Sequence, residues 1–269
     1  MRSVTVRKHS RGLNALPKVA CNATPLTRDI DPVELTHMLQ SARTNDEWPL
    51  IERTIASCGI PDNAAGVNRG DRRALYYLMR SLRPKSILEV GTSIGASTIH
   101  TALALKANQL EDIDHPYRMT TVDIVDVNDA AAKPWLAQGS PYSPKELLMK
   151  NGVADYVTFV AAPSLQYLES CNDRYDFVFL DGDHSAATVY REIPQALRVL
   201  RPGGVILLHD YFPNLDPLWS DGSLIPGPWL ATQRLMRECV GLRVLPLGAL
   251  PWPTKLNSQV TSLALLVGQ

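Results

Sequence analysis

The sequence predicts a doubly wound α/β fold, in which helices cover both faces of a mostly parallel sheet. Two observations carry this prediction. Strands are predicted at residues 86–90, 118–123, 156–161, 175–180 and 204–208. The apolar runs at 175–180 and 204–208 lack polar alternation, as is typical of strands buried on both faces of a parallel sheet. Segments with helical periodicity lie between several of these runs, which is the order expected of successive βα units.

Two helices are expected ahead of the first strand. Asp31 and Pro32 are typical of an N-cap followed by proline at the first helical position, so the pattern predicts a helix from there through Arg43. A second helix is expected from Trp48 to Cys58. Residues 1–30 lack clear periodicity. We therefore expect this segment to be partly disordered, or to form an arm that lies on a partner protein.

The end of the chain predicts the closing strands of the sheet. Residues 212–229 are dense in Pro, Gly and Trp, and we expect a long functional loop there. A helix is expected at 231–239. Apolar runs at 242–247 and 261–267 predict a C-terminal antiparallel hairpin.

Composition excludes several classes of function. The chain of 269 residues has 27 Lys plus Arg and 27 Asp plus Glu, and no basic stripe interleaved with aromatics, so we expect no nucleic-acid partner. No apolar run reaches the ~18 residues of a membrane span, and we expect no membrane partner. Four scattered cysteines without C-x-x-C spacing predict reduced thiols and a cytoplasmic setting. Formation of a homo-oligomer stays open.

The most informative segment is residues 86–98, where an apolar strand gives way to a glycine turn and then a helix. Gly91 can take positive φ and allows close backbone approach, and Gly95 allows tight packing of the helix. Unpaired N–H groups and the dipole at a helix start favour a carboxylate or a phosphate. This turn therefore predicts a binding site for a nucleotide-like ligand.

The spacing of the glycines in the turn limits the classes of ligand that it could bind. It has the form E-x-G-x-x-x-G, with Glu89 before the first glycine, rather than the G-x-G-x-x-G of dinucleotide-binding proteins. The segment resembles class I S-adenosylmethionine-dependent methyltransferases, in particular the small-molecule O-methyltransferases related to catechol O-methyltransferase. Ser97 falls on the serine of that family's E-x-G-x-x-x-G-x-S motif. Acidic residues at the ends of the later apolar runs match the family in the same order.

The resemblance implies a Rossmann-like seven-stranded sheet with N-terminal lid helices. It divides the chain into an arm with lid helices, residues 1–66, and a cofactor-binding domain, residues 67–269. By analogy, Asp123 would bind the ribose hydroxyls and Ser164 would follow the strand that lines the adenine pocket. The full set of cofactor-binding residues implied in this way is Glu89, Gly91, Thr92, Ser93, Gly95, Ser97, Asp123, Ser164 and Asp181.

A divalent metal, Mg²⁺ or Mn²⁺, is a further implication. Carboxylates gathered at one edge of a sheet need a compensating charge. Asp181 and Asp210 match two metal ligands of the catechol-type enzymes, but Tyr211 stands where their asparagine is. In antibiotic-tailoring sugar O-methyltransferases an acidic pair aligns with His209 and Asp210. The candidate metal ligands are therefore Asp181, His209 and Asp210, and the alternative is a buried His209 that only makes hydrogen bonds.

His184 is the candidate general base, with Asp181 as its catalytic partner. The histidine follows Asp181 by three residues, where the sugar enzymes carry a histidine, and imidazole is suited to accepting a hydroxyl proton near neutral pH. The alternative is a polar residue ahead of a helix that Asp183 caps. Aromatic residues that could wall an acceptor pocket are Tyr211, Phe212, Trp219 and Trp229.

These features predict an enzyme that transfers the methyl group of S-adenosylmethionine to a hydroxyl of a small metabolite, in secondary metabolism. A cyclase or lyase that consumes S-adenosylmethionine on the same fold is one alternative. A repurposed protein similar to the cephalosporin hydroxylases is another. An NAD-linked oxidoreductase is disfavoured by the missing third glycine.

Overall fold

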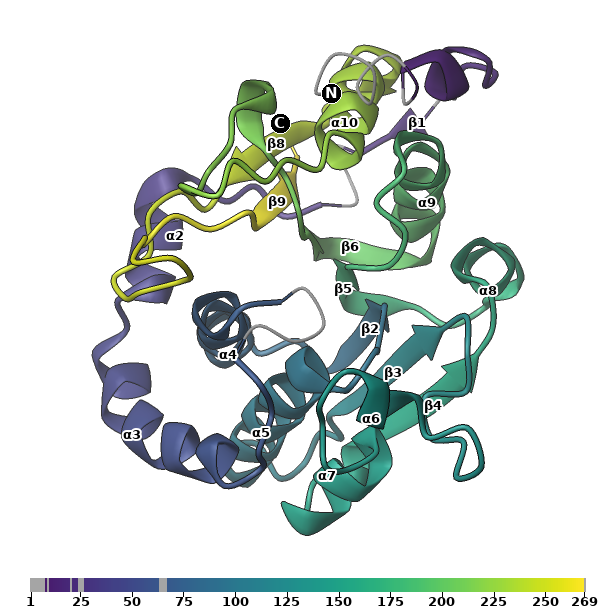
Figure 1. Cartoon of the computed structure of the whole chain (residues 1–269). Helices are drawn as coiled ribbons and strands as arrows, with labels where there is room; N and C mark the ends of the chain where they lie inside the picture. Colours follow the sequence, from purple (N-terminus) through teal and green to yellow (C-terminus); the bar gives the residue numbers. More distant parts are fainter. Residues whose placement is uncertain (1–7, 9, 20, 24–26, 63–66, 269) are drawn as a thin grey trace.

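A seven-stranded sheet forms the centre of the protein (Figure 1). The computed structural model describes residues 8, 10–19, 21–23, 27–62 and 67–268. The strand order is β4-β3-β2-β5-β6-β9-β8, in which β9 runs antiparallel to both of its neighbours and the other pairs are parallel. The strands are β2 (Ser86–Val90), β3 (Arg118–Asp123), β4 (Val157–Ala161), β5 (Tyr175–Leu180), β6 (Leu200–Leu208), β8 (Arg243–Pro246) and β9 (Ala264–Val267). The predicted α/β architecture with its antiparallel C-terminal strands is confirmed.

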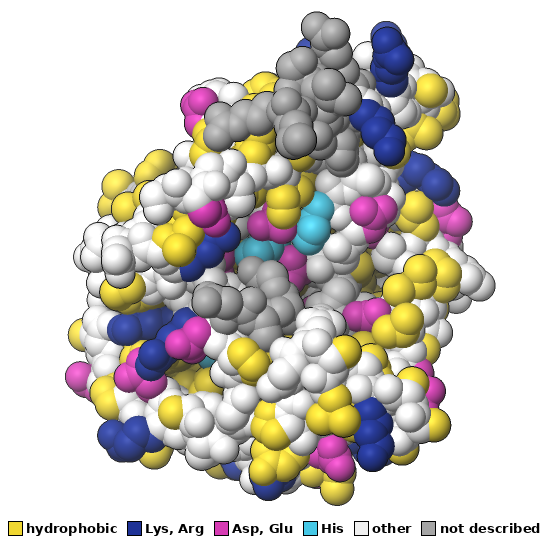
Figure 2. All heavy atoms as spheres, in the orientation of Figure 1, with side chains coloured by type: hydrophobic (Ala, Val, Ile, Leu, Met, Phe, Trp, Pro, Cys, Tyr) yellow, Lys and Arg dark blue, Asp and Glu magenta, His cyan; other side chains and the backbone are white. Residues whose placement is uncertain are grey.

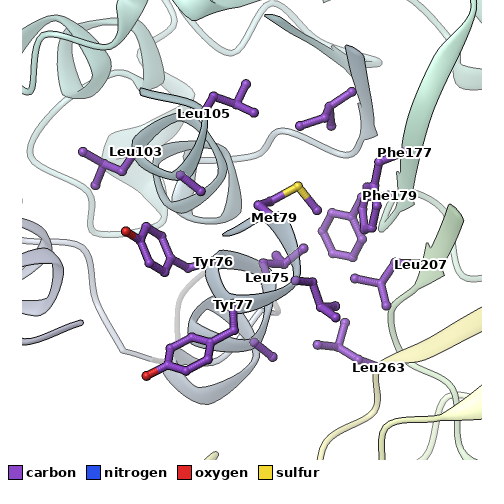
Figure 3. Close-up of a cluster of buried hydrophobic side chains, with 14 of the residues drawn as sticks. Leu75, Tyr76, Tyr77, Met79, Leu103, Leu105, Phe177, Phe179, Leu207 and Leu263 are labelled. Carbon is purple, nitrogen blue, oxygen red and sulfur yellow. The ribbon is translucent and has the colours of Figure 1, made fainter. Parts of the chain in front are cut away.

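Helices cover both faces of this sheet. On one side lie α4 (Arg69–Leu82) and α5 (Ala96–Glu111), and on the other lie α8 (Ser164–Ser170), α9 (Ala186–Val199) and α10 (Gly227–Glu238). Phe177 and Phe179 of β5 join the core under α4 and α5 (Figure 3), whereas Val178 and Leu180 join the core under α9 and α10. Because successive side chains of a strand point to opposite faces, an apolar run without alternation supplies both cores.

The helices ahead of β2 begin and end at other residues than expected. Asp31 caps α2 (Pro32–Leu39) by accepting hydrogen bonds from the backbone of the first turn, as predicted. A break then separates α2 from α3 (Ala42–Ala56), because Ser41 caps a new helix six residues before the expected start. The apolar sides of α2 and α3 pack on α4 and α5. Among the described residues, those that line the main cavity come from other segments. The role of the two helices as a lid stays a prediction.

The described part of the N-terminal arm lies on its own chain, which corrects the expectation of disorder or a partner. Leu13 is buried in the core beneath α9 and α10. Arg234 of α10 donates hydrogen bonds to the carbonyl oxygens of Leu13 and Leu16. Residues 1–7 of the basic start lie outside the described residues.

The prediction of reduced thiols is wrong for two of the four cysteines. Strand β1 (Cys21–Asn22) pairs in parallel with β7 (Cys239–Val240), and this register places Cys21 beside Cys239 in a disulfide. Cys58 and Cys171 are free and buried. The spacing gave no sign of the pair because 218 residues separate its members. The argument from reduced thiols to a cytoplasmic setting therefore loses its basis.

The C-terminal region is more ordered than the sequence predicts. Helix α10 begins at Gly227, within the expected loop, and the short helix η2 (Pro213–Leu215) follows β6. The remaining helices are α6 (Pro134–Ala137), α7 (Pro144–Lys150) and η1 (Ala154–Tyr156). Within the described residues, every helix is too short or too polar to cross a bilayer.

Candidate functional site

A cavity of about 660 Å³ lies at the carboxyl ends of β2, β3 and β5. Open parallel sheets bind their ligands at this edge. Most of the residues predicted to bind a cofactor line it, namely Gly91, Thr92, Ser93, Ser97, Asp123, Ser164 and Asp181. His184 lines it as well. Figure 2 shows histidine and acidic side chains together in the hollow near the middle of this face.

Close packing around the turn after β2 requires glycine at two of its positions. Gly91 has φ +97°, and a Cβ added there would lie 2.2 Å from the carbonyl oxygen of Asp181. Gly95 has φ +76° and forms the N-cap of α5, where a Cβ would lie 2.9 Å from Cβ of Pro144. The predicted positive φ is confirmed for Gly91, and Gly95 has a positive φ that the sequence did not predict. Their close neighbours are, however, other parts of this chain, and Gly95 packs against the start of α7.

Gly91→Ala is expected to destabilise the protein strongly, by about 2–4 kcal/mol, because overpacking and a strained positive φ act together. Chemical denaturation of the variant and the wild type measures this loss. Gly203→Ala is the matched control, since Gly203 also has positive φ but has open space around its Cβ position. An equal loss in both variants would show that the close contact with Asp181 has no separate cost.

Glu89 lies behind the turn rather than in the cavity. It is fully buried and accepts hydrogen bonds of 2.6 Å from the hydroxyls of Ser97, Thr98 and Thr121. Burial raises the pKa of Glu89 to about 7, although the three hydroxyl donors oppose this shift. Glu89 therefore holds α5 and β3 against β2, and Ser97 is the member of this group that reaches the cavity.

Asp123 joins the turn to the end of β3. Its Oδ2 accepts hydrogen bonds from the backbone N–H groups of Thr92 at 3.1 Å and Ser93 at 2.9 Å, and its Oδ1 accepts from Val125 at 3.2 Å. The same carboxylate lines the cavity. Asp123 can therefore hold the turn in shape and still offer oxygen atoms to hydroxyls of a ligand.

Ser164 begins α8, just after β4, and lines the cavity. Its hydroxyl donates a hydrogen bond to Glu192 of α9. Burial raises the pKa of Glu192 to about 7, with the hydrogen bond from Ser164 opposing the shift. The pair links α8 to α9 beneath the cavity wall.

His184 lies between two carboxylates at the rim of the cavity. Its Nε2 is 3.3 Å from Oδ2 of Asp210 and 3.8 Å from Oδ1 of Asp181, and 29% of its side chain is exposed. A Cβ on Gly227 would lie 1.9 Å from the carbonyl oxygen of His184, so the start of α10 presses against this loop. Ser185 caps α9, while Asp183 accepts hydrogen bonds from Ser185 and Thr188. The helix cap is thus Ser185, whereas the sequence suggested Asp183.

His209 occupies the buried centre of the acidic cluster. Its Nδ1 is 3.0 Å from Oδ1 of Asp181 and 3.3 Å from Oδ1 of Asp210, but neither contact has the alignment of a hydrogen bond. Its Nε2 is 3.2 Å from Oδ2 of Asp71 on α4. Asp71 is completely buried. Nothing in the sequence marks it as a site residue, because it sits in an arginine-rich helix start far from every motif.

The charges of this cluster compensate one another. Burial opposes protonation of His209, but the charges of Asp181 and Asp210 raise its pKa well above the usual value. Burial opposes ionisation of Asp210, yet the charge of His209 lowers its pKa to about 2. Burial raises the pKa of Asp181. The arrangement is that of an imidazolium between carboxylates.

The candidate metal ligands do not fit a divalent cation in this arrangement. A metal-binding histidine must offer an unprotonated nitrogen, whereas both ring nitrogens of His209 face carboxylates that favour its protonated form. In the described part of the chain, no group of three or more His, Cys, Asp or Glu side chains is placed to hold a metal ion. A metal site at Asp181, His209 and Asp210 therefore stays a prediction that this arrangement does not support.

The aromatic residues that follow β6 are mainly core residues. Tyr211, Phe212 and Trp219 are buried. Phe212 and Trp219 pack edge to face with 5.6 Å between ring centroids. Trp229 is partly exposed on α10. None of the four is among the described residues that line the main cavity.

Part of this chain is similar to known methyltransferases. Residues 88–211 match the family described as "Methyltransferase domain". This match spans 124 of the 269 residues of the chain. The chain is 32% identical over 139 residues to a caffeoyl-CoA O-methyltransferase of Populus kitakamiensis, covering 50% of each protein. It is 24% identical over 135 residues to a putative O-methyltransferase of Mycobacterium sp. strain JLS. The chain thus spans about half the length of these curated relatives.

Solved structures share the fold of the methyltransferase domain and its flanking segments. TomG from Streptomyces achromogenes, an O-methyltransferase of tomaymycin synthesis solved with SAM, has a TM-score of 0.54 at 18% identity, over 91% of this chain and 92% of that one. A putative O-methyltransferase from Klebsiella pneumoniae has a TM-score of 0.54 at 24% identity, over 89% and 91%. At these identities the comparison establishes the fold.

Proposed function

We propose that this protein transfers the methyl group of S-adenosylmethionine to a hydroxyl of a small biosynthetic metabolite. One observation carries the proposal. The glycine turn, Asp123 and His184 all line a single cavity of about 660 Å³ in a chain with a methyltransferase domain. Binding residues and a candidate base therefore meet in one space, as transfer between two bound molecules requires.

The residues around the cavity suit S-adenosylmethionine. Asp123 would accept hydrogen bonds from the two ribose hydroxyls, and the turn at Thr92 and Ser93 would face the methionine part. Ser164, which also lines the cavity, would lie on the adenine side. When bound, the cofactor supplies a methyl group on a positively charged sulfur. Its cationic charge favours the acidic end of the cavity at Asp181.

His184 is the group that would activate the acceptor. Its Nε2 would take the hydroxyl proton while the oxygen forms a bond to the methyl carbon. S-adenosylmethionine would supply the methyl group and retain the electron pair of the carbon–sulfur bond on its sulfur, leaving as S-adenosylhomocysteine. Asp210, 3.3 Å from Nε2 before the acceptor enters, would stabilise the imidazolium that forms.

We propose that transfer proceeds without a divalent metal, because His209 already supplies a positive charge between Asp181 and Asp210. Exhaustive treatment with a chelator is expected to leave the rate of methyl transfer unchanged, and added Mg²⁺ or Mn²⁺ is expected to have no effect. Elemental analysis of the purified protein provides the control. Loss of activity with the chelator, and its recovery on adding metal, would contradict this part of the proposal.

Product analysis tests the proposed function against its rivals. The protein would be incubated with S-adenosylmethionine carrying a trideuterated methyl group and a panel of phenols, alcohols and carboxylic acids. Methyl transfer yields S-adenosylhomocysteine and a labelled ether or ester, and only when an acceptor is present. Formation of methylthioadenosine without an acceptor would instead indicate a cyclase or lyase, and would overturn the proposal.

A further inference from the structure

A second cavity, of about 480 Å³, lies between α3, α4 and the loop that precedes β9. Its lining includes Trp48, Arg69, Gly70, Arg73, Trp252 and Lys255. Neither the glycine turn nor His184 contributes to it. This cavity is therefore separate from the one proposed for the cofactor, and it is rich in cationic and aromatic side chains.

Arg73 is the central cation of this cavity. Its guanidinium carbon lies 4.2 Å from the ring centroid of Trp252, 4.9 Å from that of Trp48 and 5.2 Å from that of Tyr77. Its Nη2 donates a hydrogen bond of 2.9 Å to the hydroxyl of Tyr77. Among the described residues, no carboxylate lies within ion-pair distance of Arg73. The aromatic rings hold the guanidinium in place without neutralising it.

Two buried N–H groups of the cavity residues lack acceptors. Nε of Arg73 and Nε1 of Trp48 are both buried, and neither has a hydrogen-bond partner in the described structure. Trp48 is only 4% exposed. Because an unpaired buried donor is unfavourable, these two groups call for an oxygen acceptor from outside the protein.

The other charges around the cavity leave it cationic. Arg69 is paired with Glu52 at 2.7 Å, and Asp62 interacts electrostatically with Arg72. The ammonium group of Lys255 lies 3.7 Å above the ring of Trp219. As with Arg73, the described residues place no carboxylate within ion-pair distance of Lys255.

Two residues connect the second cavity to the acidic cluster around His209. Gly70 lines the cavity, and the next residue, Asp71, contacts His209. Lys255 also lines it, and its charge helps to lower the pKa of Asp210 after the effects of burial and the two histidines. A molecule held at Arg73 therefore lies on the side of the acidic cluster where Asp71 contacts His209.

We propose that this cavity binds an oxygen anion, a carboxylate or a phosphate, carried by the methyl acceptor. Arg73 and Lys255 provide the charge, and the N–H groups of Arg73 and Trp48 provide donors for its oxygen atoms. The substrate class is thus an anionic small metabolite that bears a hydroxyl group. The identification of the bound anion as part of the methyl acceptor rests on the proposed function. Binding of an anion in this cavity can, however, be tested without measuring methyl transfer.

The test titrates the whole protein with inorganic phosphate and, separately, with malonate, at constant ionic strength kept with chloride. Calorimetry and tryptophan fluorescence follow binding, since Trp48 and Trp252 pack on Arg73. Saturable binding of at least one anion is expected in the wild type. Arg73→Gln is expected to weaken it about ten- to a hundredfold, the range of a charge-assisted hydrogen bond. The anion that binds with the higher affinity shows whether the cavity prefers a phosphate or a carboxylate.

Two further variants keep the result interpretable. Arg118→Gln removes the same charge from an exposed position at the start of β3 and is expected to bind like the wild type. Trp48→Phe keeps a ring but removes the N–H donor, and is expected to weaken binding several-fold even if Arg73→Gln fails to fold. No saturable binding by the wild type, or equal binding by the cavity variants and Arg118→Gln, would overturn the proposal. Binding of S-adenosylhomocysteine, measured in parallel, reports separately on the proposed function.

Discussion

His184→Ala is expected to lower kcat by about 10²–10⁴-fold, the usual contribution of a general base. The affinity for S-adenosylmethionine should stay nearly unchanged, because the turn and Asp123 supply the binding groups on another part of the cavity wall. Steady-state kinetics with the acceptor found by product analysis, together with calorimetry of the cofactor, measures both quantities.

A matched substitution controls for the general effect of losing an imidazole. His115→Ala removes an exposed histidine that is hydrogen-bonded to Asp112 and lies ahead of β3, whose other end carries Asp123. It is expected to leave kcat unchanged. If His184→Ala kept the wild-type kcat, His184 would be structural, and the base would have to be sought among Asp181 and Asp210, which lie beside it.

His209→Ala is expected to reduce the free energy of unfolding by about 3–5 kcal/mol, the cost of removing one partner from a buried ionic group. The substitution leaves Asp71, Asp181 and Asp210 close together without their internal cation. Chemical denaturation measures the loss. Adding Asp71→Asn removes one of the carboxylates, so the double variant is expected to recover part of the stability.

The pH dependence of stability gives a second check on His209. Its folded pKa is raised above the unfolded value of 6.5. The stabilisation from His209 is therefore fully present below pH 6.5 and is lost as the pH rises through the folded pKa. Wild-type stability should fall in alkaline solution more than that of His209→Ala. Equal pH profiles, with little loss in the variant, would show that His209 is neutral and contributes no charge.

Much of the fold follows from local patterns, which the apolar runs show best. Residues 175–180 read as a strand buried on both faces because Phe177 and Phe179 serve one core while Val178 and Leu180 serve the other. The cap at Asp31 was predictable for a similar reason, since its hydrogen bonds reach only the next few residues. Short-range patterns therefore predicted most of the strands and the glycine turn that lines the main cavity.

Contacts over long range were not predictable in this way. Cys21 and Cys239 meet only because β1 lies beside β7. Asp71 and His209 are 138 residues apart, and only the packing of α4 on the sheet brings them together. The role of His209 depends on the number of carboxylates around it, which the sequence does not reveal. For this reason the sequence left open whether His209 binds a metal or only its carboxylate neighbours.

Calorimetric titration with S-adenosylhomocysteine tests the central claim most directly. We predict saturable binding to the wild type and binding weakened by about 1.5–3 kcal/mol in Asp123→Ala, the range of hydrogen bonds to a charged group. Because Asp123 also holds the turn through Thr92 and Ser93, circular dichroism must show that the variant stays folded. Binding of NAD in place of S-adenosylhomocysteine, or identical isotherms for the wild type and the variant, would contradict the assignment of this cavity to the cofactor.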